Sequence, residues 1–393
     1  QSFGKNVQGN ADEKEMLRAF STFCILSDLD VLCSYNGDSF DFPFVTERAN
    51  KLGVAMDYGT GNVQLVGKGI NEGARLRGIQ HVDVFQLAKL LTRFQFLKSP
   101  RLDLESVMQA VFGEGKKSLN VKQINEIWST QKGLDGLAEY NLNDSIYTLR
   151  LAEEFLPLIA EIAALLGEPL YEVNRATASQ LVERVLVNDS FAKNKIIPNS
   201  PSDQQVQARL QHPIEGGYVR EPVVGLHTHV AVLDFRSLYP SIMISHNISP
   251  DTLDCAHEKC KTGKNVSPTG HWFCEKQKGL VAEAMEKILD QRISVQTQMD
   301  ALPKKDAQQT MLKARKQALK IVLNSFFGTL GYPRFRWYSR ESARAITAWA
   351  RHYIRDTLAA AEKEGYPPIY SDTDSAFIQV PAEKGEEEVR AFV

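Results

Sequence analysis

Two aspartates stand two residues apart near the carboxyl end of the chain, in Tyr370-Ser371-Asp372-Thr373-Asp374-Ser375. Apolar residues flank this segment on both sides, Pro368-Ile369 before it and Ala376-Phe377-Ile378 after it. Apolar runs around a short polar segment predict a tight β-hairpin with the acids at its tip. Two carboxylates held this close repel unless a cation neutralises them, and hard divalent cations such as Mg²⁺ prefer oxygen ligands. The segment therefore predicts a hairpin that carries a divalent-metal site.

A second acidic element lies earlier, in Val232-Leu233-Asp234-Phe235-Arg236-Ser237-Leu238-Tyr239-Pro240-Ser241. Here a single Asp ends an apolar strand just before a turn. An Asp in such a place is usually a turn or cap residue. Two acidic elements side by side would instead form a two-metal site for phosphoryl transfer.

A third segment, Lys320-Ile321-Val322-Leu323-Asn324-Ser325-Phe326-Phe327-Gly328, falls between these two. In this order the three segments resemble the palm motifs of family B DNA polymerases: D-x-x-S-L-Y-P-S, K-x-x-x-N-S-x-Y-G and Y-x-D-T-D-S. Phe327 stands where the second motif usually has Tyr, which keeps the stacking ring and drops a hydroxyl. The resemblance extends over nearly the whole chain and is to the archaeal branch. It implies template-directed DNA synthesis, with deoxynucleotidyl transfer to a primer 3′-OH by a two-metal mechanism.

The resemblance also implies the metals and their ligands. Two Mg²⁺ ions are expected in each active site, with Mn²⁺ as a substitute. Asp234 and Asp374 are expected to bridge both metals, with Asp372 as a supporting acid. The carbonyl of Phe235 is expected to complete a metal shell.

Nucleotide-binding residues follow from the same motifs. Backbone N–H groups that turn out of the strand are expected to hold the triphosphate as a nest. The ring of Tyr239 is expected to exclude a 2′-OH. Lys320, Asn324 and Phe327 recur at helical spacing and share one face. The Arg292 guanidinium is suited to grip the γ-phosphate, although Gln296 stands one turn later where the family commonly has Lys. The nucleotide-binding set is Phe235, Ser237, Leu238, Tyr239, Arg292, Lys320, Asn324 and Phe327.

The amino-terminal part resembles the associated 3′–5′ proofreading exonuclease. Tyr35-Asn36-Gly37-Asp38-Ser39-Phe40-Asp41 resembles its second motif, and Tyr140-Asn141-Leu142-Asn143-Asp144 its third. Asp41 and Asp144 are then expected to bind metal, and Tyr140 to orient the attacking water. No D-x-E first motif precedes Asn36, and Asp103-Leu104-Glu105 reads as a helix start. Proofreading is therefore expected to be incomplete.

The expected fold class is α/β and α+β multidomain. We expect a truncated ribonuclease H-like exonuclease domain at 1–155, connecting helices and linker at 156–225, and the first part of the palm at 226–278. A helical-hairpin fingers subdomain is expected at 279–328, and the second part of the palm, with its antiparallel sheet, at 329–393. The resemblance implies a fragment that stops before the thumb and has weak, distributive activity. Expected helices are 13–26, 41–52, 86–93, 198–211, 280–299, 307–327 and 341–362, and expected strands are 31–35, 62–68, 79–85 and 230–234.

Charge alone would not suggest a nucleic-acid enzyme, because 46 basic and 48 acidic residues nearly cancel to a net charge of −2. Basic residues concentrate at 304–320 and 331–355, so a groove for DNA must be local. No run of 18 apolar residues and no signal-peptide pattern is present, which makes a cytoplasmic, nucleoid-associated protein the expectation. Expected partners are primer–template DNA, deoxynucleoside triphosphates and, for the full-length parent, a sliding clamp, but no membrane.

Three of the five cysteines cluster in the sequence with two histidines: Cys255, Cys260, Cys274, His257 and His271. A Zn²⁺ site is one interpretation, but this spacing matches none of the regular ligand patterns well. The resemblance to archaeal members from hot habitats implies a disulfide between Cys260 and Cys274. Free thiols are the third interpretation. Cys24 and Cys33 lie in apolar runs and are expected in the core.

Other functions fit the residues less well. An exonuclease alone is disfavoured because its first motif is absent while all three palm motifs are present. A non-catalytic, polymerase-derived fragment that only binds nucleic acid is the alternative, disfavoured by the intact Asp234, Asp372, Asp374 and Lys320. Reverse transcriptase or RNA polymerase palms carry paired acids, but in different sequence contexts.

Overall fold

The computed structural model describes residues 9–67, 73–115 and 119–381, together with residues 385, 387 and 390. Its contacts divide the chain into two compact units. The first comprises Gln1–Thr177 and Ala307–Ala318, and the second comprises Ala178–Asp306 and Leu319–Val393. The expected boundary at residue 155 lies inside one continuous helix, Leu134–Leu166. The first compact unit continues beyond this helix to Thr177.

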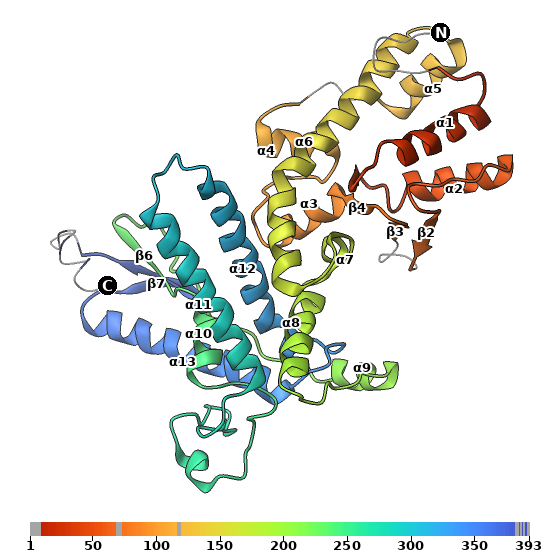
Figure 1. The fold of residues 1–393 in the computed structure, drawn as a ribbon. Helices are drawn as coiled ribbons and strands as arrows, with labels where there is room; N and C mark the ends of the chain where they lie inside the picture. The colour runs from red at the N-terminus through yellow and green to blue at the C-terminus, as the bar shows by residue number, and fades with distance from the viewer. Residues whose placement is uncertain are drawn as a thin grey trace. The chain divides into compact units, whose positions relative to one another are not determined.

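The first unit contains two pairs of short strands (Figure 1). β1 (Val31–Ser34) and β4 (Gln80–Asp83) pair in parallel, whereas β2 (Val63–Val66) and β3 (Gly73–Leu76) pair antiparallel. The sequence predicts all of these except β3, although Lys68 of the predicted strand 62–68 lies outside the described residues. β4 ends at Asp83 rather than at Phe85, because the Asp83 side chain caps the next helix by accepting a hydrogen bond from the Phe85 N–H.

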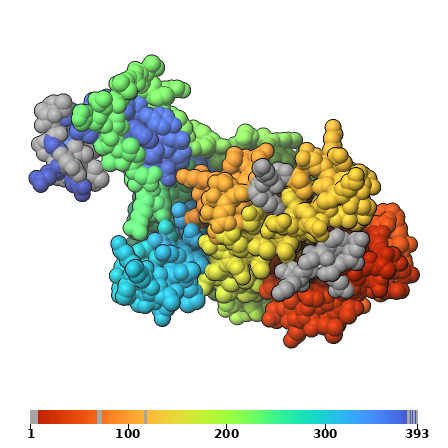
Figure 2. Space-filling model, turned by 90° about the horizontal axis from the view of Figure 1, so that it is seen from above, coloured from red at the N-terminus to blue at the C-terminus, as the bar shows by residue number. Residues whose placement is uncertain are grey.

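Helices make up most of the first unit. α1 and α2 have the bounds that the sequence predicts. Helices α3, α4 and α5 all contact α6, and their orange and yellow surfaces adjoin in the space-filling view (Figure 2). The helices are α1 (Glu13–Leu26), α2 (Asp41–Leu52), α3 (Val84–Arg93), α4 (Leu104–Phe112), α5 (Val121–Thr130), α6 (Leu134–Leu166) and α7 (Leu170–Arg175).

An apolar cluster joins α1 and α2 to the β2–β3 pair. α1 buries Leu17, Ser21 and Cys24, which recur every three or four residues and so lie on one helical face. Phe42 of α2 and Ala74 of β3 join the same core. The Cys24 thiol is therefore a core residue, as the sequence predicts, with only 2% of its surface exposed.

The second unit is organised around a four-stranded antiparallel sheet in the order β5-β7-β8-β6. Its strands are β5 (Val219–Arg220), β6 (Val230–Asp234), β7 (Pro368–Asp372) and β8 (Ser375–Gln379). The strand that ends at Asp234 and the hairpin around Asp372 are thus both confirmed. The ladder between β6 and β8 runs from the pair Val230–Gln379 to the pair Asp234–Ser375.

Long helices complete the second unit. Helices α11, α12 and α13 begin and end within three residues of the predicted bounds, whereas α10 follows a segment that the sequence predicts only as a turn. Residues of α12 before Leu319 are counted with the first unit. The helices are α8 (Ala178–Ala192), α9 (Asp203–Leu210), α10 (Leu238–Ser245), α11 (Leu280–Ala301), α12 (Gln308–Leu330) and α13 (Arg340–Lys363).

Helix α13 packs against the sheet. Its buried Ile354 and Leu358 meet Ala376 of β8, with Leu233 of β6 and Phe235 at the edge of the same cluster. This apolar support fixes the ends of β6 and β8, where the acidic residues lie. Among the helices in the described part of the chain, none is long and apolar enough to cross a membrane.

Candidate active sites in the two units

The sheet of the second unit brings together acids that lie far apart in the sequence. Asp234 is the last residue of β6 and Asp372 the last of β7, and each is opposite Ser375 on the intervening strand β8. Residues directly opposite on neighbouring strands point to the same face of the sheet. Asp234 and Asp372 therefore share one face, on either side of Ser375.

Asp374 lies in the turn between β7 and β8. Its N–H donates to the Asp372 carbonyl at 2.7 Å, and its own carbonyl accepts from the Phe235 N–H at 2.9 Å. The second bond ties the end of β6 to the turn and so places Asp374 beside Asp234. Thr373 has a φ of 58°, which is strained for a β-branched residue. Hydrogen bonds from its N–H to the Tyr218 carbonyl and from its hydroxyl to Asp372, both 2.8 Å, hold it there.

These carboxylates repel one another. Burial raises the pKa of Asp374, and the negative charges of Asp234 and Asp372 raise it further. A divalent cation would relieve this repulsion. The donors are all oxygen atoms, which suits Mg²⁺. The residues present thus fit the divalent metal that the sequence predicts.

Two aromatic rings lie next to the acids. Tyr239 of α10 stacks on Phe327 of α12, with ring centroids 3.7 Å apart and planes 1° apart. The space between the rings is filled, so a sugar or base can contact one ring only from its other face or edge. Burial raises the pKa of the Tyr239 hydroxyl, and the nearby Asp374 raises it further. A Cβ atom on Gly217 would lie 3.2 Å from this hydroxyl, so the backbone approaches closely here.

The amino-terminal end of α10 presents free backbone donors. Ser237, the residue before the helix, has the left-handed angles φ 59° and ψ 47°, and its side chain makes no cap. The first N–H groups of a helix lack partners within it. Leu238 and Tyr239 supply such donors, whereas Pro240 has none. A left-handed residue before a helix start forms a nest that suits an anion.

Cationic and polar side chains of the second unit lie on the two long helices. Arg292 of α11 is half-buried, and its Nε is a buried donor without a hydrogen-bond partner. Burial lowers the pKa of its guanidinium, and the nearby Arg236 lowers it further. Arg236 is a cation that sequence reasoning missed, although it stands within the first palm segment. Lys320 and Asn324 are exposed one turn apart on α12.

The predicted exonuclease residues line one cavity of about 840 Å³ in the first unit. Asp41 is the first residue of α2, whereas Tyr140 and Asp144 lie one turn apart on α6. Burial raises the pKa of Asp41. Burial also raises the pKa of Tyr140, as do the charge of Asp144 and a hydrogen bond to it. All three residues are thus brought together.

Two further acids line this cavity. Asp103 caps α4 by accepting from the Ser106 N–H at 2.9 Å, so the predicted helix start is confirmed. Yet Asp103 and Glu105 also face the cavity that holds Asp41 and Asp144. Sequence reasoning missed this, because the order of the segments gave no reason to place α4 beside α2 and α6.

A buried ionic network supports the loop that precedes Asp41. Asp38 pairs with Arg175 at 2.7 Å and lies 3.4 Å from the His81 Nδ1. Asp83 accepts hydrogen bonds from the Asn36 and Asp38 N–H groups. Burial lowers the pKa of His81 to about 4 and raises that of Asp83 to about 6. These partners are too far apart in the sequence for any local signal to join them.

All five cysteines, each within the described part of the chain, are free thiols. The Cys260–Cys274 bond that the resemblance implies is not formed in the structure. Instead both residues gather with Cys255 and His257, whereas His271 pairs with Asp254 at 2.8 Å. Cys33 is only partly buried and lines the exonuclease cavity.

The sequence matches the DNA polymerase family B pattern over residues 169–392, and the exonuclease domain of DNA polymerase family B over residues 2–107. Asp234, Asp372 and Asp374 lie within the first of these ranges and Asp41 within the second, whereas Tyr140 and Asp144 lie between the two. The chain belongs to DNA polymerase family B.

Its relatives include archaeal enzymes. DNA polymerase 1 of Pyrococcus abyssi is 36% identical over 383 residues, which cover 97% of this chain and 49% of that protein. The DNA polymerase of Thermococcus gorgonarius is 35% identical over 381 residues, 95% of this chain and 48% of that protein. The solved structure of the family B DNA polymerase from the hyperthermophilic archaeon Pyrobaculum calidifontis superimposes with a TM-score of 0.81 at 29% identity, covering 98% of this chain and 49% of that one. The chain thus spans about half the length of the relatives it matches.

Proposed function

We propose that this chain carries the synthetic site and part of the 3′–5′ proofreading site of a DNA-directed DNA polymerase. The observation that carries the proposal is the register of β6, β7 and β8. It sets Asp234 and Asp372, which are 138 positions apart, on one face of the sheet and places Asp374 beside them. We assign the palm to 226–278 and 329–393 and the fingers to 279–328. The exonuclease domain is assigned to 1–155 and the connecting region to 156–225.

Asp234, Asp374 and the Phe235 carbonyl would hold two divalent cations, Mg²⁺ or Mn²⁺, which activate the primer 3′-oxygen and neutralise phosphate charge. Asp372 supports the pair, because its carboxylate holds the Thr373 hydroxyl and so shapes the turn. The protein's remaining task is to bind and align the substrates.

The triphosphate would lie at the start of α10. Its oxygens can accept from the Ser237, Leu238 and Tyr239 N–H groups. The unpartnered Nε of Arg292 is a further donor for a phosphate oxygen. On α12, Lys320 and Asn324 would add a charge and an amide to the same binding site.

The stacked rings of Tyr239 and Phe327 would contact the sugar and the base of the incoming nucleotide. Tyr239 stacks on Phe327, and this contact opposes movement of its ring when a ribonucleotide enters. A rigid ring beside the sugar excludes a 2′-OH by steric conflict. Phe327 in turn offers an apolar surface to the base pair.

In the first unit, Asp41 and Asp144 would hold a cation for 3′–5′ hydrolysis, and Tyr140 would orient the water. The cavity acids Asp103 and Glu105 add negative charge at the same place. Proofreading by this chain is expected to be weak. Primer–template DNA and deoxynucleoside triphosphates are the proposed substrates, with a sliding clamp as partner of the whole protein in a nucleoid-associated, cytoplasmic setting.

Primer extension tests the proposal. A labelled primer–template is incubated with Mg²⁺ and one deoxynucleotide at a time, with the wild type and with Asp374→Ala. Addition of only the templated nucleotide, by the wild type alone, is the expected result. Equal extension by the variant would contradict the assignment. Binding of the duplex without any extension would favour a fragment that only binds nucleic acid.

A further inference from the structure

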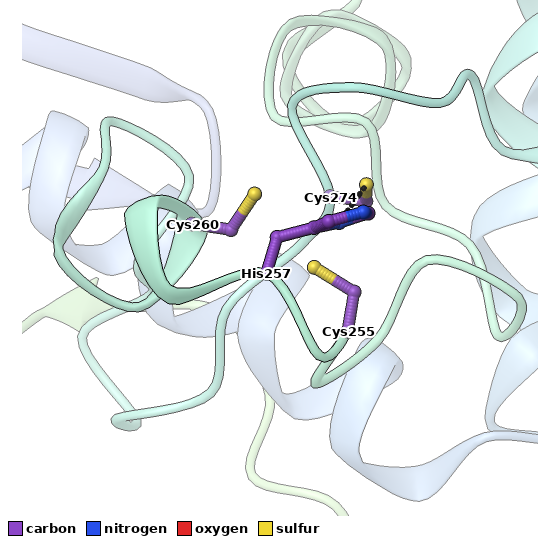
Figure 3. Close-up of side chains that lie close together, drawn as sticks. All are labelled: Cys255, His257, Cys260 and Cys274. Atoms are coloured by element: carbon purple, nitrogen blue, oxygen red, sulfur yellow. Dashed lines mark hydrogen bonds between the residues drawn. The ribbon is translucent and has the colours of Figure 1, made fainter.

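Four side chains that the palm chemistry does not use converge between α10 and α11 (Figure 3). They are Cys255, His257, Cys260 and Cys274. Their donor atoms, three sulfurs and one ring nitrogen, all lie within 4.8 Å of one another. The Cys274 Sγ and the His257 Nδ1 are 3.4 Å apart. Cys260 and Cys274 are 1% and 2% exposed, and the other two are half-buried.

These distances suit a tetrahedral metal. With Zn–S bonds of about 2.3 Å and Zn–N bonds of about 2.0–2.1 Å, tetrahedral ligand atoms lie about 3.5–3.8 Å apart. Small side-chain shifts bring the four donors into that range. A Cys260–Cys274 disulfide would leave Cys255 and His257 without a role. The sequence spacing of the four ligands is unusual, but the local fold brings their side chains together.

That local structure comes from a short helical turn and two isolated bridges. His257 precedes the 3₁₀ helix Glu258–Thr262, which carries Cys260. Bridges between Leu253 and Phe273 and between Val266 and Trp272 bring the chain back on itself. The chain thus folds back so that Cys274 lies beside the segment that carries Cys255, His257 and Cys260.

The sulfur atoms also accept backbone hydrogen bonds. The Glu275 N–H donates to the Cys260 Sγ at 3.4 Å, and the neighbouring backbone N–H groups of Lys276 and Gln277 lower the pKa of the Cys274 thiol. Such bonds orient and stabilise thiolate ligands. The Trp272 indole fixes the Cys255 backbone by donating to its carbonyl at 2.9 Å.

The local charge balance favours a metal with three thiolates. Three thiolates and a neutral imidazole around a divalent ion carry a net charge of −1. Residues 255–278 contain more lysines than glutamates, so cations are at hand to offset it: Lys259, Lys261, Lys264, Lys276 and Lys278 against Glu258 and Glu275.

We propose that Cys255, His257, Cys260 and Cys274 form a structural Zn²⁺ site. Thiolate and imidazole donors select zinc over Mg²⁺, so this site is chemically separate from the acidic palm site. Four protein ligands leave no open position, which is typical of structural rather than catalytic zinc.

The site would hold the loop that leads into α11. Asn247 donates to the Cys274 carbonyl at 2.7 Å and accepts from the Gly279 N–H at 2.8 Å. Asp251 accepts from the Leu280 N–H, the first of α11. Zinc would therefore fix the base of the helix that carries Arg292.

Metal analysis of the purified chain tests the proposal. We expect one zinc per chain by mass spectrometry of the metal content. After chelation, added Co²⁺ should give the absorption bands of tetrahedral cobalt–thiolate coordination. The Co²⁺ measurement uses the wild type, so it does not depend on whether a variant folds.

A matched pair of variants identifies the histidine ligand. Loss of an outer-sphere partner already lowers metal affinity by about 10–100-fold, so His257→Gln should lower zinc affinity at least as much. His271→Gln, in the same loop but paired with Asp254, should keep it. Cys255→Ser provides a second loss-of-ligand variant. Zinc retained by His257→Gln as in the wild type would overturn the ligand set.

Counting thiols separates the remaining outcomes. Alkylation of the denatured, unreduced protein should modify all five cysteines. Zinc-free protein with five reactive thiols would overturn the proposal. Zinc-free protein with only three would overturn it in favour of a disulfide. Neither result depends on polymerase activity, so it leaves the proposed function untouched.

Discussion

The acids of the second unit stand on one sheet, whereas those of the first are carried by separate helices. Asp234 and Asp372 are placed by the backbone ladder through β8, and Asp374 by a hydrogen bond to Phe235. Asp41 and Asp144, on α2 and α6, depend on side-chain packing and on the buried network around Asp38. Backbone hydrogen bonds between strands fix the positions of the acids in the second unit. The helices of the first unit are instead held in place by contacts between their side chains and their surroundings.

Removing one palm acid at a time should have the largest effect on synthesis. We expect Asp234→Ala to lower the rate of nucleotide addition by about 10³-fold or more. Each factor of ten in rate corresponds to about 1.4 kcal/mol of activation free energy, and a ligand that bridges two metals contributes several kcal/mol to transition-state stabilisation. Asp372→Ala should have a clearly smaller effect, since its proposed role is to support the turn. Single-turnover kinetics check both. Equal decreases in the rate of the two variants would mean that Asp372 binds metal as Asp234 does.

The support of the exonuclease site is tested with Arg175→Met. This change leaves the Asp38 carboxylate buried without its partner, so the free energy of unfolding of the first unit should fall by about 3–5 kcal/mol. Arg75→Met is the matched control, because Arg75 also contacts Tyr171 but pairs with Glu172 at the surface. Its expected cost is at most about 1 kcal/mol. Chemical denaturation measures both, and equal costs would show that the buried network gives no special support.

The ring pair in the second unit is tested with Tyr239→Ala. Opening the space beside the sugar should reduce discrimination against ribonucleotides by roughly 10–100-fold. Tyr239→Phe keeps the ring and its stack on Phe327, so discrimination should persist. Relative incorporation of a matched ribonucleotide and deoxynucleotide is the measurement. Unchanged discrimination in the alanine variant would remove Tyr239 from the gate role.

The smallest effect concerns the repulsion among the palm acids. Because the pKa of Asp374 is raised in the folded state, this state binds its proton more readily than the unfolded chain does. The contribution of Asp374 to stability is therefore present at low pH and is lost as pH rises through its folded-state pKa. Without metal, Asp374→Asn should raise the free energy of unfolding at neutral pH, by less than about 1 kcal/mol for this partly exposed group.

That gain should vanish below about pH 4, where the carboxyl is protonated in both states. Asp356→Asn, which removes an exposed acid paired with His352 on α13, serves as the control. Thermal melts in chelator across the pH range measure both variants. A loss of stability at neutral pH in Asp374→Asn would show that the carboxylate makes net favourable contacts in the metal-free protein.

The sequence predicts best what adjacent residues determine. Leu17, Ser21 and Cys24 reveal the buried face of α1, and the apolar run before Asp234 reveals β6 and its acidic end. It fails where contacts span long distances. Nothing local joins Asp38 to Arg175, or indicates that Glu105 lines the same cavity as Asp144. The spacing of Cys255, His257 and Cys260 matches no regular ligand pattern, so the sequence alone does not show that the fold gathers these side chains with Cys274.

One measurement compares the two acidic sites most directly: single-turnover addition of a templated deoxynucleotide by the wild type, Asp374→Ala and Asp41→Ala. We expect Asp374→Ala to abolish addition and Asp41→Ala to leave its rate unchanged. Addition that survives in Asp374→Ala, or that is lost in Asp41→Ala, would contradict the assignment of synthesis to the sheet acids of the second unit.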